Sequence, residues 1–192
     1  MGSRISQCGG MLYPETYYLL SSYNEEDVLR VFINEFKKQT EILNIDNRKL
    51  YDKMILASII ESESREYTEM PIISSVFHNR LGLNMRLDAD PTIIYCMQLD
   101  DVKCNYMNFL GSKNSVNLFS EYKKSNCEYN TYLHFGLPPS PICNPGKEAI
   151  LSALNPNITN YKYFVSDGNG KHIFSQNLRE HINNINELRN LK

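Results

Sequence analysis

The sequence contains no tryptophan and no long apolar run. A membrane-spanning helix needs roughly 20 apolar residues, whereas the longest apolar stretch, Met54–Ile60, is short and contains Ser58. The N-terminal segment Met1–Ser6 lacks the apolar centre of a secretory signal peptide. We therefore expect residues 1–10 to be a tail and residues 11–192 to form the folded part of the chain.

Cysteine occurs in an odd number and in no recognisable pairing motif. The residues are Cys8, Cys96, Cys104, Cys127 and Cys143. No Cys-x-x-Cys pair occurs and the spacing matches no zinc site, so we predict thiols without a shared role. One or two disulfides are compatible with the sequence if the chain works in an oxidising compartment, and their pairing is open. The cysteines and histidines together predict no metal site and no Cys–His nucleophile.

Neither sign of charge prevails. Lys and Arg number 20, Asp and Glu number 22, and the net charge is −2. A protein that grips a phosphate backbone is usually basic, so nucleic acid is not an expected partner. The apolar share of 42% and the charged share of 22% exclude a disordered chain. A length of 192 residues suits one domain.

Apolar periodicity and capping residues predict a helix-rich chain. Asn24 is a predicted N-cap, followed by acidic residues 25–27 where the helix dipole favours them. Polar turn residues 167–170 separate two short apolar segments and predict a β-hairpin. The predicted fold class is α+β, with a small antiparallel hairpin, loops and short helices over 100–145, and helices over about 25–43, 48–64, 71–82, 91–97, 148–154 and 176–191.

The helix over 48–64 is apolar nearly all round, which predicts a central position. At about 100° per residue from Leu50, Glu61 falls at about 20°, inside the apolar arc. Glu63 falls at about 220°, beside Asp52 on a polar strip. A carboxyl in an apolar cleft keeps its proton to higher pH and can act as a general acid. Glu61 is therefore the candidate acid; the alternative is that it lies past the packed turns and faces water.

Other carboxyls lie close to Glu61 in the sequence. Glu61 and Glu63 are not expected to form an acid and nucleophile pair, because side chains two residues apart on a helix diverge. Asp88 and Asp90 lie in an extended segment and would share one face, as partners or ligands. Asp90 precedes Pro91 and is also a candidate helix cap.

Several segments, in order, resemble the endolytic murein transglycosylase family, also called YceG-like. They are residues 11–17, 56–64, 76–81, 85–95, 129–132, 136–146 and 163–181. The resemblance aligns the family's catalytic glutamate with Glu61. A Gln is usual where Asp88 stands, and Lys-Glu-Thr commonly follows the catalytic glutamate where this chain has Ser62-Glu63-Ser64.

The resemblance implies a lyase that cleaves the β-1,4 bond between N-acetylmuramic acid and N-acetylglucosamine in nascent peptidoglycan. The muramic C6 hydroxyl would displace the bond and leave a 1,6-anhydro end, with Glu61 as sole acid and base and with no metal or cofactor. The polar residues of the matching segments are candidate substrate contacts: Asn79, Arg80, Asp88, Asp90, Tyr95, Asn130 and Tyr132.

Structural alternatives accompany these candidates. Arg80 and Asp90 could form an ion pair, Tyr95 could belong to a helix core, and Asn130 could cap a turn. The proline-rich loop 136–146 could wall a cleft or simply connect elements. His172 and His181 are predicted as surface or hairpin residues rather than as acid or base groups.

The resemblance also implies a location and partners. The family usually has an N-terminal membrane anchor and a LysM-like module, and we recognise neither in this sequence. We expect work on glycan strands at the outer face of the bacterial cytoplasmic membrane, near peptidoglycan synthases. A non-catalytic peptidoglycan-binding scaffold is the alternative, motivated by Asp88. A pyridoxal-phosphate lyase is disfavoured, because no glycine-rich loop suits the phosphate.

Overall fold

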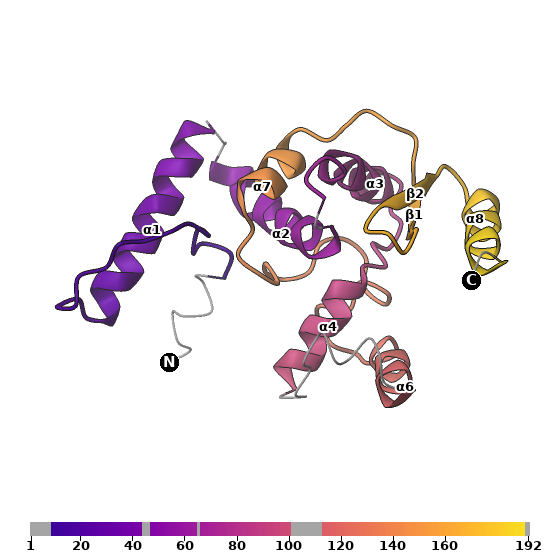
Figure 1. The fold of residues 1–192 in the computed structure, drawn as a ribbon, viewed down its shortest axis with the longest axis horizontal. Coiled ribbons are helices and arrows are strands. Elements are labelled where there is room, and N and C mark those ends of the chain that lie inside the picture. Colours follow the sequence, from indigo (N-terminus) through magenta and orange to yellow (C-terminus); the bar gives the residue numbers. More distant parts are fainter. Residues whose placement is uncertain (1–8, 44–46, 65, 101–112, 191–192) are drawn as a thin grey trace.

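The computed structural model describes residues 9–43, 47–64, 66–100 and 113–190. A small antiparallel sheet accompanies the helices, which confirms the predicted α+β class (Figure 1). In chain order the elements are α1 Glu25–Ile42, α2 Asn47–Glu63, α3 Met70–Gly82, α4 Asp90–Leu99, α6 Lys113–Tyr122, α7 Lys147–Leu154, β1 Tyr163–Ser166, β2 His172–Ser175 and α8 Leu178–Asn190. Within the described ranges, no helix is both long and apolar enough to cross a membrane.

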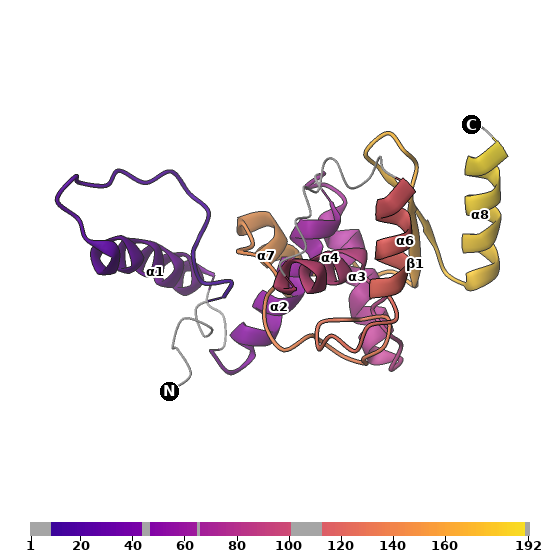
Figure 2. The same cartoon turned by 90° about the horizontal axis from the view of Figure 1, so that it is seen from below.

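Helix α1 begins with a reciprocal cap. The Asn24 side chain accepts a hydrogen bond from the Asp27 amide at 2.9 Å, and the Asp27 carboxylate accepts one from the Asn24 amide at 3.2 Å. This capping box confirms Asn24 as the predicted N-cap. Of the α1 residues, Phe36 alone is buried. Figures 1 and 2 show α1 at the N-terminal end of the molecule, to one side of the central helices.

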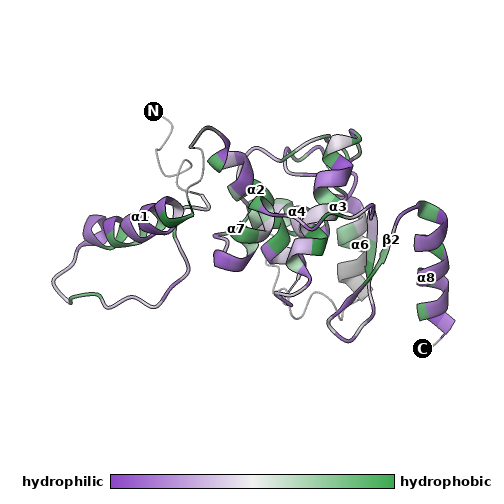
Figure 3. Ribbon diagram, turned by 90° about the horizontal axis from the view of Figure 1, so that it is seen from above, coloured by the Kyte–Doolittle hydropathy of each residue, from purple (hydrophilic) through white to green (hydrophobic). Residues whose placement is uncertain are grey.

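Helix α2 forms the centre of the core, as its apolar circumference predicts. Every residue from Met54 to Ile60 is buried, and the helix packs on α3, α4 and α7. Figure 3 shows apolar residues concentrated on these elements, whereas α8 is mostly hydrophilic. The buried Ser58 hydroxyl donates to the Ile55 carbonyl at 2.7 Å and accepts from the Ile142 amide at 3.0 Å. The loop 136–146 is therefore fixed directly to α2.

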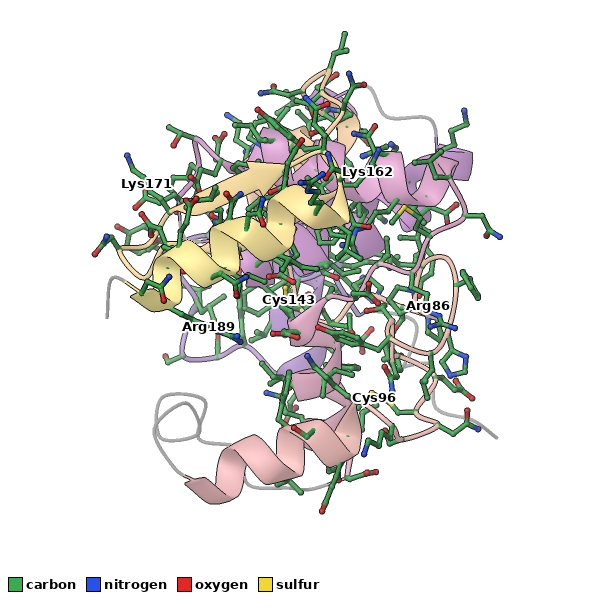
Figure 4. The ribbon with its side chains drawn as sticks, turned by 90° about the vertical axis from the view of Figure 1, so that its right-hand side faces the viewer. Arg86, Cys96, Cys143, Lys162, Lys171 and Arg189 are labelled. Atoms are coloured by element: carbon green, nitrogen blue, oxygen red, sulfur yellow. A yellow bond between two sulfur atoms is a disulfide. The ribbon has the colours of Figure 1, made fainter. Side chains whose placement is uncertain are left out.

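The predicted hairpin is present in antiparallel register. Tyr163 pairs with Ser175 and Ser166 pairs with His172. Figure 4 shows Lys162 where the hairpin begins and Lys171 near its turn, with α8 lying along the two strands. Strand β1 also contacts α3, where Phe77 meets Phe164 edge to face at 6.0 Å. The hairpin thus forms a wall beside the helical core.

A disulfide joins α4 to the loop that follows α6. Cys96 and Cys127 are bonded across a sequence separation of 31 residues. Among the described cysteines, Cys143 is free, while Cys8 and Cys104 lie outside the described residues. The bond holds the start of the 127–132 segment against α4, which carries Asp90 at its first turn.

Candidate functional site

A cavity lies where α2 ends, and it is called the large cavity below. Its volume is about 600 Å³. Its walls come from the ends of α2 and α3, the 87–90 segment, the hairpin and α8. Of the predicted site residues, it brings together Arg80, Asp88, Asp90 and Tyr132. It also includes Glu63, Lys123, His172 and His181, which were not among the predicted site residues.

Glu63, the last residue of α2, has the environment expected of a general acid. It is half-buried by exposed area, but protein atoms crowd its carboxyl. This burial, with added repulsion from Asp90 and a smaller opposing effect of Arg80, raises the pKa of Glu63 to about 8. No described residue forms a hydrogen bond to its carboxyl, and the side chain lines the cavity, where a ligand can meet it.

The predicted position of Glu63 on a polar strip is wrong. Asp52, which shares that side of the helix, is exposed as predicted. The strip does not continue to the C-terminal end of α2, because the hairpin, Tyr132 and Asp90 surround that end. A helical wheel assigns each face one environment along its length, whereas here the environment changes within about three turns.

Asp90, Lys123 and Tyr132 form a connected polar group on one wall. The Tyr132 hydroxyl donates to the Asp90 carboxylate, and the Lys123 ammonium lies 3.1 Å from the same oxygen and 3.0 Å from the hydroxyl. Burial and then the Asp90 charge raise the pKa of Tyr132, so it stays a neutral donor. The prediction of Asp90 as a helix cap is wrong, because the N-cap of α4 is Ala89 and no side chain caps the helix.

Arg80 and Asp88 form a second pair. Arg80 Nη1 lies 3.0 Å from the Asp88 carboxylate, and its guanidinium also donates to the carbonyls of Lys162, Arg86 and Leu87. The predicted ion pair of Arg80 with Asp90 is therefore wrong, because Arg80 pairs with Asp88 instead. Arg80 is buried, whereas the Asp88 side chain is 41% exposed and lines the cavity. Asp88 adopts a left-handed backbone conformation with φ of 47°.

His172 is fixed by a carboxylate behind it. Its Nδ1 lies 2.8 Å from Glu69 Oε2, and its backbone amide donates to Glu69 Oε1 at 3.2 Å. His172 lies on the hairpin, as predicted, but only 11% of its side chain is exposed. His181, on α8, stacks on Tyr163 at 5.3 Å. Both imidazoles line the large cavity.

Glu61 lies at a different, smaller cavity of about 340 Å³. The Gly146 amide donates to Glu61 Oε2 at 3.1 Å, at the start of α7. The side chain is half-buried beside Pro91, Ile94 and Ile142. The prediction of an apolar neighbourhood for Glu61 therefore agrees with its surroundings, but that neighbourhood is not the cavity that holds the other carboxyls.

The remaining predicted site residues lie outside the large cavity. Asn79 donates its amide to the carbonyls of Thr159 and Tyr161. Asn130 is fully buried and donates to three carbonyls, those of Tyr122, Lys123 and Ser125.

Asn130 caps a turn, in agreement with the structural alternative. Its Oδ1 accepts from the Tyr132 amide at 3.0 Å, so it holds Tyr132 in place. Tyr95 lines the small cavity and packs on Tyr129 at 4.7 Å. The loop 136–146 does wall a cleft, since Ile142 and Cys143 line the small cavity.

Within the described part of the chain, no group of three His, Cys, Asp or Glu side chains could hold a metal ion. The large cavity itself offers proton donors and charged groups. Glu63 can donate a proton near neutral pH, and the Asp90–Lys123–Tyr132 and Arg80–Asp88 groups can bind hydroxyl or amide groups of a polar ligand.

Comparisons with known proteins agree on one family. A model of the YceG-like family matches residues 2–187. An endolytic murein transglycosylase of Bacillus subtilis is 30% identical over 181 residues, covering 90% of this chain and 45% of that protein. One of Streptococcus pneumoniae strain R6 is 25% identical over 188 residues, covering 95% of this chain and 32% of that protein.

A solved structure has the same fold. The crystal structure of a yceG-like protein from Listeria monocytogenes superposes with a TM-score of 0.71 at 29% identity. It covers 92% of this chain and 55% of that chain. This chain therefore spans about half of that structure and less than half of the curated relatives it matches.

Proposed function

This chain belongs to the YceG-like family, and on that premise we propose that it cleaves the β-1,4 bond between N-acetylmuramic acid and N-acetylglucosamine in peptidoglycan strands. The reaction is a lytic transglycosylation that leaves 1,6-anhydro ends. Residues 11–192 form the catalytic part, and Glu63 is the acid and base. The names of the relatives support the reaction class, and the position of Glu63 supports its role.

One observation carries the choice of residue. The Glu63 carboxyl lies in a cavity of about 600 Å³, and its pKa is raised to about 8. No described side chain donates a hydrogen bond to it. An acid that protonates a leaving oxygen must hold its proton at neutral pH. Glu61 occupies the position that the resemblance favours. Its Oε2, however, accepts a hydrogen bond from the Gly146 amide at the start of α7, and the side chain faces the smaller cavity.

The mechanism needs no second catalytic carboxylate. Glu63 donates its proton to the glycosidic oxygen as that bond breaks, and the substrate's acetamido group stabilises the developing positive charge at C1. The muramic C6 hydroxyl then attacks C1 and closes the 1,6-anhydro ring. The Glu63 carboxylate takes the proton of that hydroxyl, which returns the enzyme to its starting state.

The polar groups around Glu63 suit a sugar strand. Asp90 and Tyr132, joined by Lys123, offer a carboxylate and a neutral donor within one hydrogen-bonded group. Asp88 offers an exposed carboxylate held by Arg80. Such fixed donors and acceptors orient a substrate without reorganising, which lowers the cost of reaching the transition state.

The nature of the product tests this proposal. Uncross-linked, peptide-free glycan strands are incubated with the protein, and the ends are identified by mass spectrometry. The expected result is 1,6-anhydro-muramic ends from the wild-type chain. Tight binding of strands with no new ends of any kind would instead indicate the scaffold alternative.

Asp88 favours a second candidate reaction, hydrolysis. It lies in the same cavity as Glu63 and keeps a cationic partner in Arg80. A protonated carboxyl and a charged one in one cavity are the pair by which glycosidases activate water. Hydrolysis would give reducing muramic ends that disappear in Asp88→Asn, whereas the lytic reaction gives anhydro ends in both proteins.

The pH dependence follows from the acid role. Because the pKa of Glu63 is raised to about 8, the proton is present below that pH and is lost above it. We expect kcat/KM on peptide-free strands to fall as pH rises through about 8, tenfold for each further pH unit. The measurement is kcat/KM from about pH 6 to about pH 10, and activity that stays constant over this range contradicts the proposal.

Location and partners are part of the same proposal. A murein substrate implies action outside the cytoplasm, and the relatives are longer than this chain. We infer that the chain works on glycan strands at the outer face of the bacterial cytoplasmic membrane, beside peptidoglycan synthases. The Cys96–Cys127 disulfide agrees with an oxidising compartment.

A further inference from the structure

The small cavity lies on the other side of the α2–α4 contact from Glu63. Glu61 and Glu63 are two residues apart on α2, so their side chains diverge by about 200°. On α4, Asp90 lines the large cavity, while Pro91, Ile94 and Tyr95 line the small one. The ends of the same two helices therefore serve two cavities, of which the proposed reaction uses one.

The small cavity combines one negative charge with apolar walls. Its described lining includes Glu61 and no basic residue, and Ile94 and Ile142 supply apolar surface. Burial raises the pKa of the Cys143 thiol, which keeps it neutral. The Ser62 hydroxyl and the Cys143 thiol both donate to the Ser58 carbonyl, at 2.9 and 3.3 Å. Glu61 is thus the dominant electrostatic feature of the cavity.

Glu61 is also fixed in position. The Gly146 amide holds Oε2, and α7, which starts at the next residue, packs firmly on α2. No described donor reaches the other oxygen, Oε1. A fixed carboxylate with a free oxygen above apolar walls suits an ammonium group carried on an alkyl chain, because the walls cover the chain and the carboxylate pairs with its end.

We propose that the small cavity binds a primary alkylammonium, and that on the substrate this is the free side-chain amine of a peptide stem. The inference rests on the proposed function for the identity of the ligand. An α-helix with its side chains is about 10–12 Å across, and an extended peptide advances about 3.3–3.6 Å per residue. A stem of a few residues, starting on a sugar in the large cavity, reaches across the α2–α4 contact.

The charge of the side-chain amine depends on whether the stem is cross-linked. When a stem becomes cross-linked, its side-chain amine is converted to an amide and loses its charge. A carboxylate pocket without a basic residue distinguishes the two forms by that charge alone. The protein would then select strands whose stems are not yet cross-linked.

The test measures binding, so that it does not depend on cleavage. Two soluble glycan strands carry the same lysine-containing stem, one with a free side-chain amine and one with that amine acetylated. Dissociation constants are measured by calorimetry with Glu63→Gln, which is intended to leave the strands intact. We expect the acetylated strand to bind about tenfold more weakly, since a hydrogen-bonded ion pair is replaced by a neutral amide.

Two substitutions locate the effect. In Glu61→Gln combined with Glu63→Gln, both strands should bind equally. Because Glu61 also holds the start of α7, a second variant, Ile94→Lys, places a cation in the cavity and leaves the Gly146 bond intact; it too should abolish the difference. Ile94→Met is its matched control and should retain the tenfold ratio.

The outcomes separate the two proposals. Equal binding of the two strands to the Glu63→Gln protein overturns the amine site, as does a tenfold ratio that survives in both Glu61→Gln and Ile94→Lys. Failure of the wild-type protein to cleave peptide-free strands overturns the proposed function instead, and leaves the binding ratio to be judged by itself.

Discussion

Glu63→Gln is expected to lower the rate of glycan cleavage by roughly 10²–10⁴-fold, the usual contribution of a positioned acid and base. The amide has nearly the same shape as the protonated carboxyl but cannot give up a proton to the glycosidic oxygen. Since the Glu63 carboxyl has no hydrogen-bond donor among the described residues, the substitution removes no hydrogen bond of the described structure. The loss should therefore appear in kcat rather than in folding or in substrate binding.

Glu61→Gln provides the decisive comparison. It removes the same charge two residues earlier, and on peptide-free strands we expect it to reduce the rate by less than about tenfold. Glu66→Gln, at an exposed position beyond α2, is the matched control for the chemical change and should behave as wild type. If instead Glu61→Gln is inactive and Glu63→Gln is active, the alignment of the catalytic glutamate with Glu61 is right and our assignment is wrong.

Arg80→Met is expected to have the largest effect on stability, about 3 kcal/mol of unfolding free energy. The substitution keeps much of the side-chain volume but leaves three carbonyls without the guanidinium, those of Lys162, Arg86 and Leu87. One of these carbonyls lies just before β1 of the hairpin, and the other two lie in the 85–90 segment. The substitution therefore removes the hydrogen bonds that hold these two walls of the large cavity together. For a chain of this size, the melting temperature should fall by about 6–12 °C.

Arg86→Met is the matched control for this substitution. Arg86 is exposed, and its guanidinium lies over the Phe135 ring at 5.0 Å. A contact of this kind contributes about 0.5–1 kcal/mol at an exposed site, so the melting temperature should change by only a few degrees. Thermal unfolding followed by circular dichroism measures both variants, and equal melting temperatures would contradict the structural role of Arg80.

The fold was largely predictable from local signals. The cap at Asn24, the all-apolar helix and the turn at 167–170 each depend on a few neighbouring residues, and the corresponding elements are present. The pairing of Cys96 with Cys127 was not predictable, because it depends on how α4 and the chain after α6 come together. Spacing carries no information on such contacts.

The sequence predicted part of the candidate site, and Glu63 was not among the predicted site residues. Arg80, Asp88, Asp90 and Tyr132 do share one cavity, although they are distant in sequence. The helical wheel failed at Glu63, because the elements that bury this residue follow it in the chain by many residues. Burial at a helix end is a tertiary property, and a pattern within the helix reports only the faces that the helix itself presents.

The Cys96–Cys127 bond also bears on how the chain can vary in length. It joins α4 to the start of the 127–132 segment across a sequence separation of 31 residues, so these two parts of the chain stay together whatever the length of chain between α4 and α6. For a flexible loop whose ends are already together, doubling the length costs only about 0.6 kcal/mol. Insertions between α4 and α6 are therefore thermodynamically inexpensive, whereas the chain from Tyr122 to Cys127 must keep its length, because its carbonyls hold Asn130 and Lys123 lines the cavity.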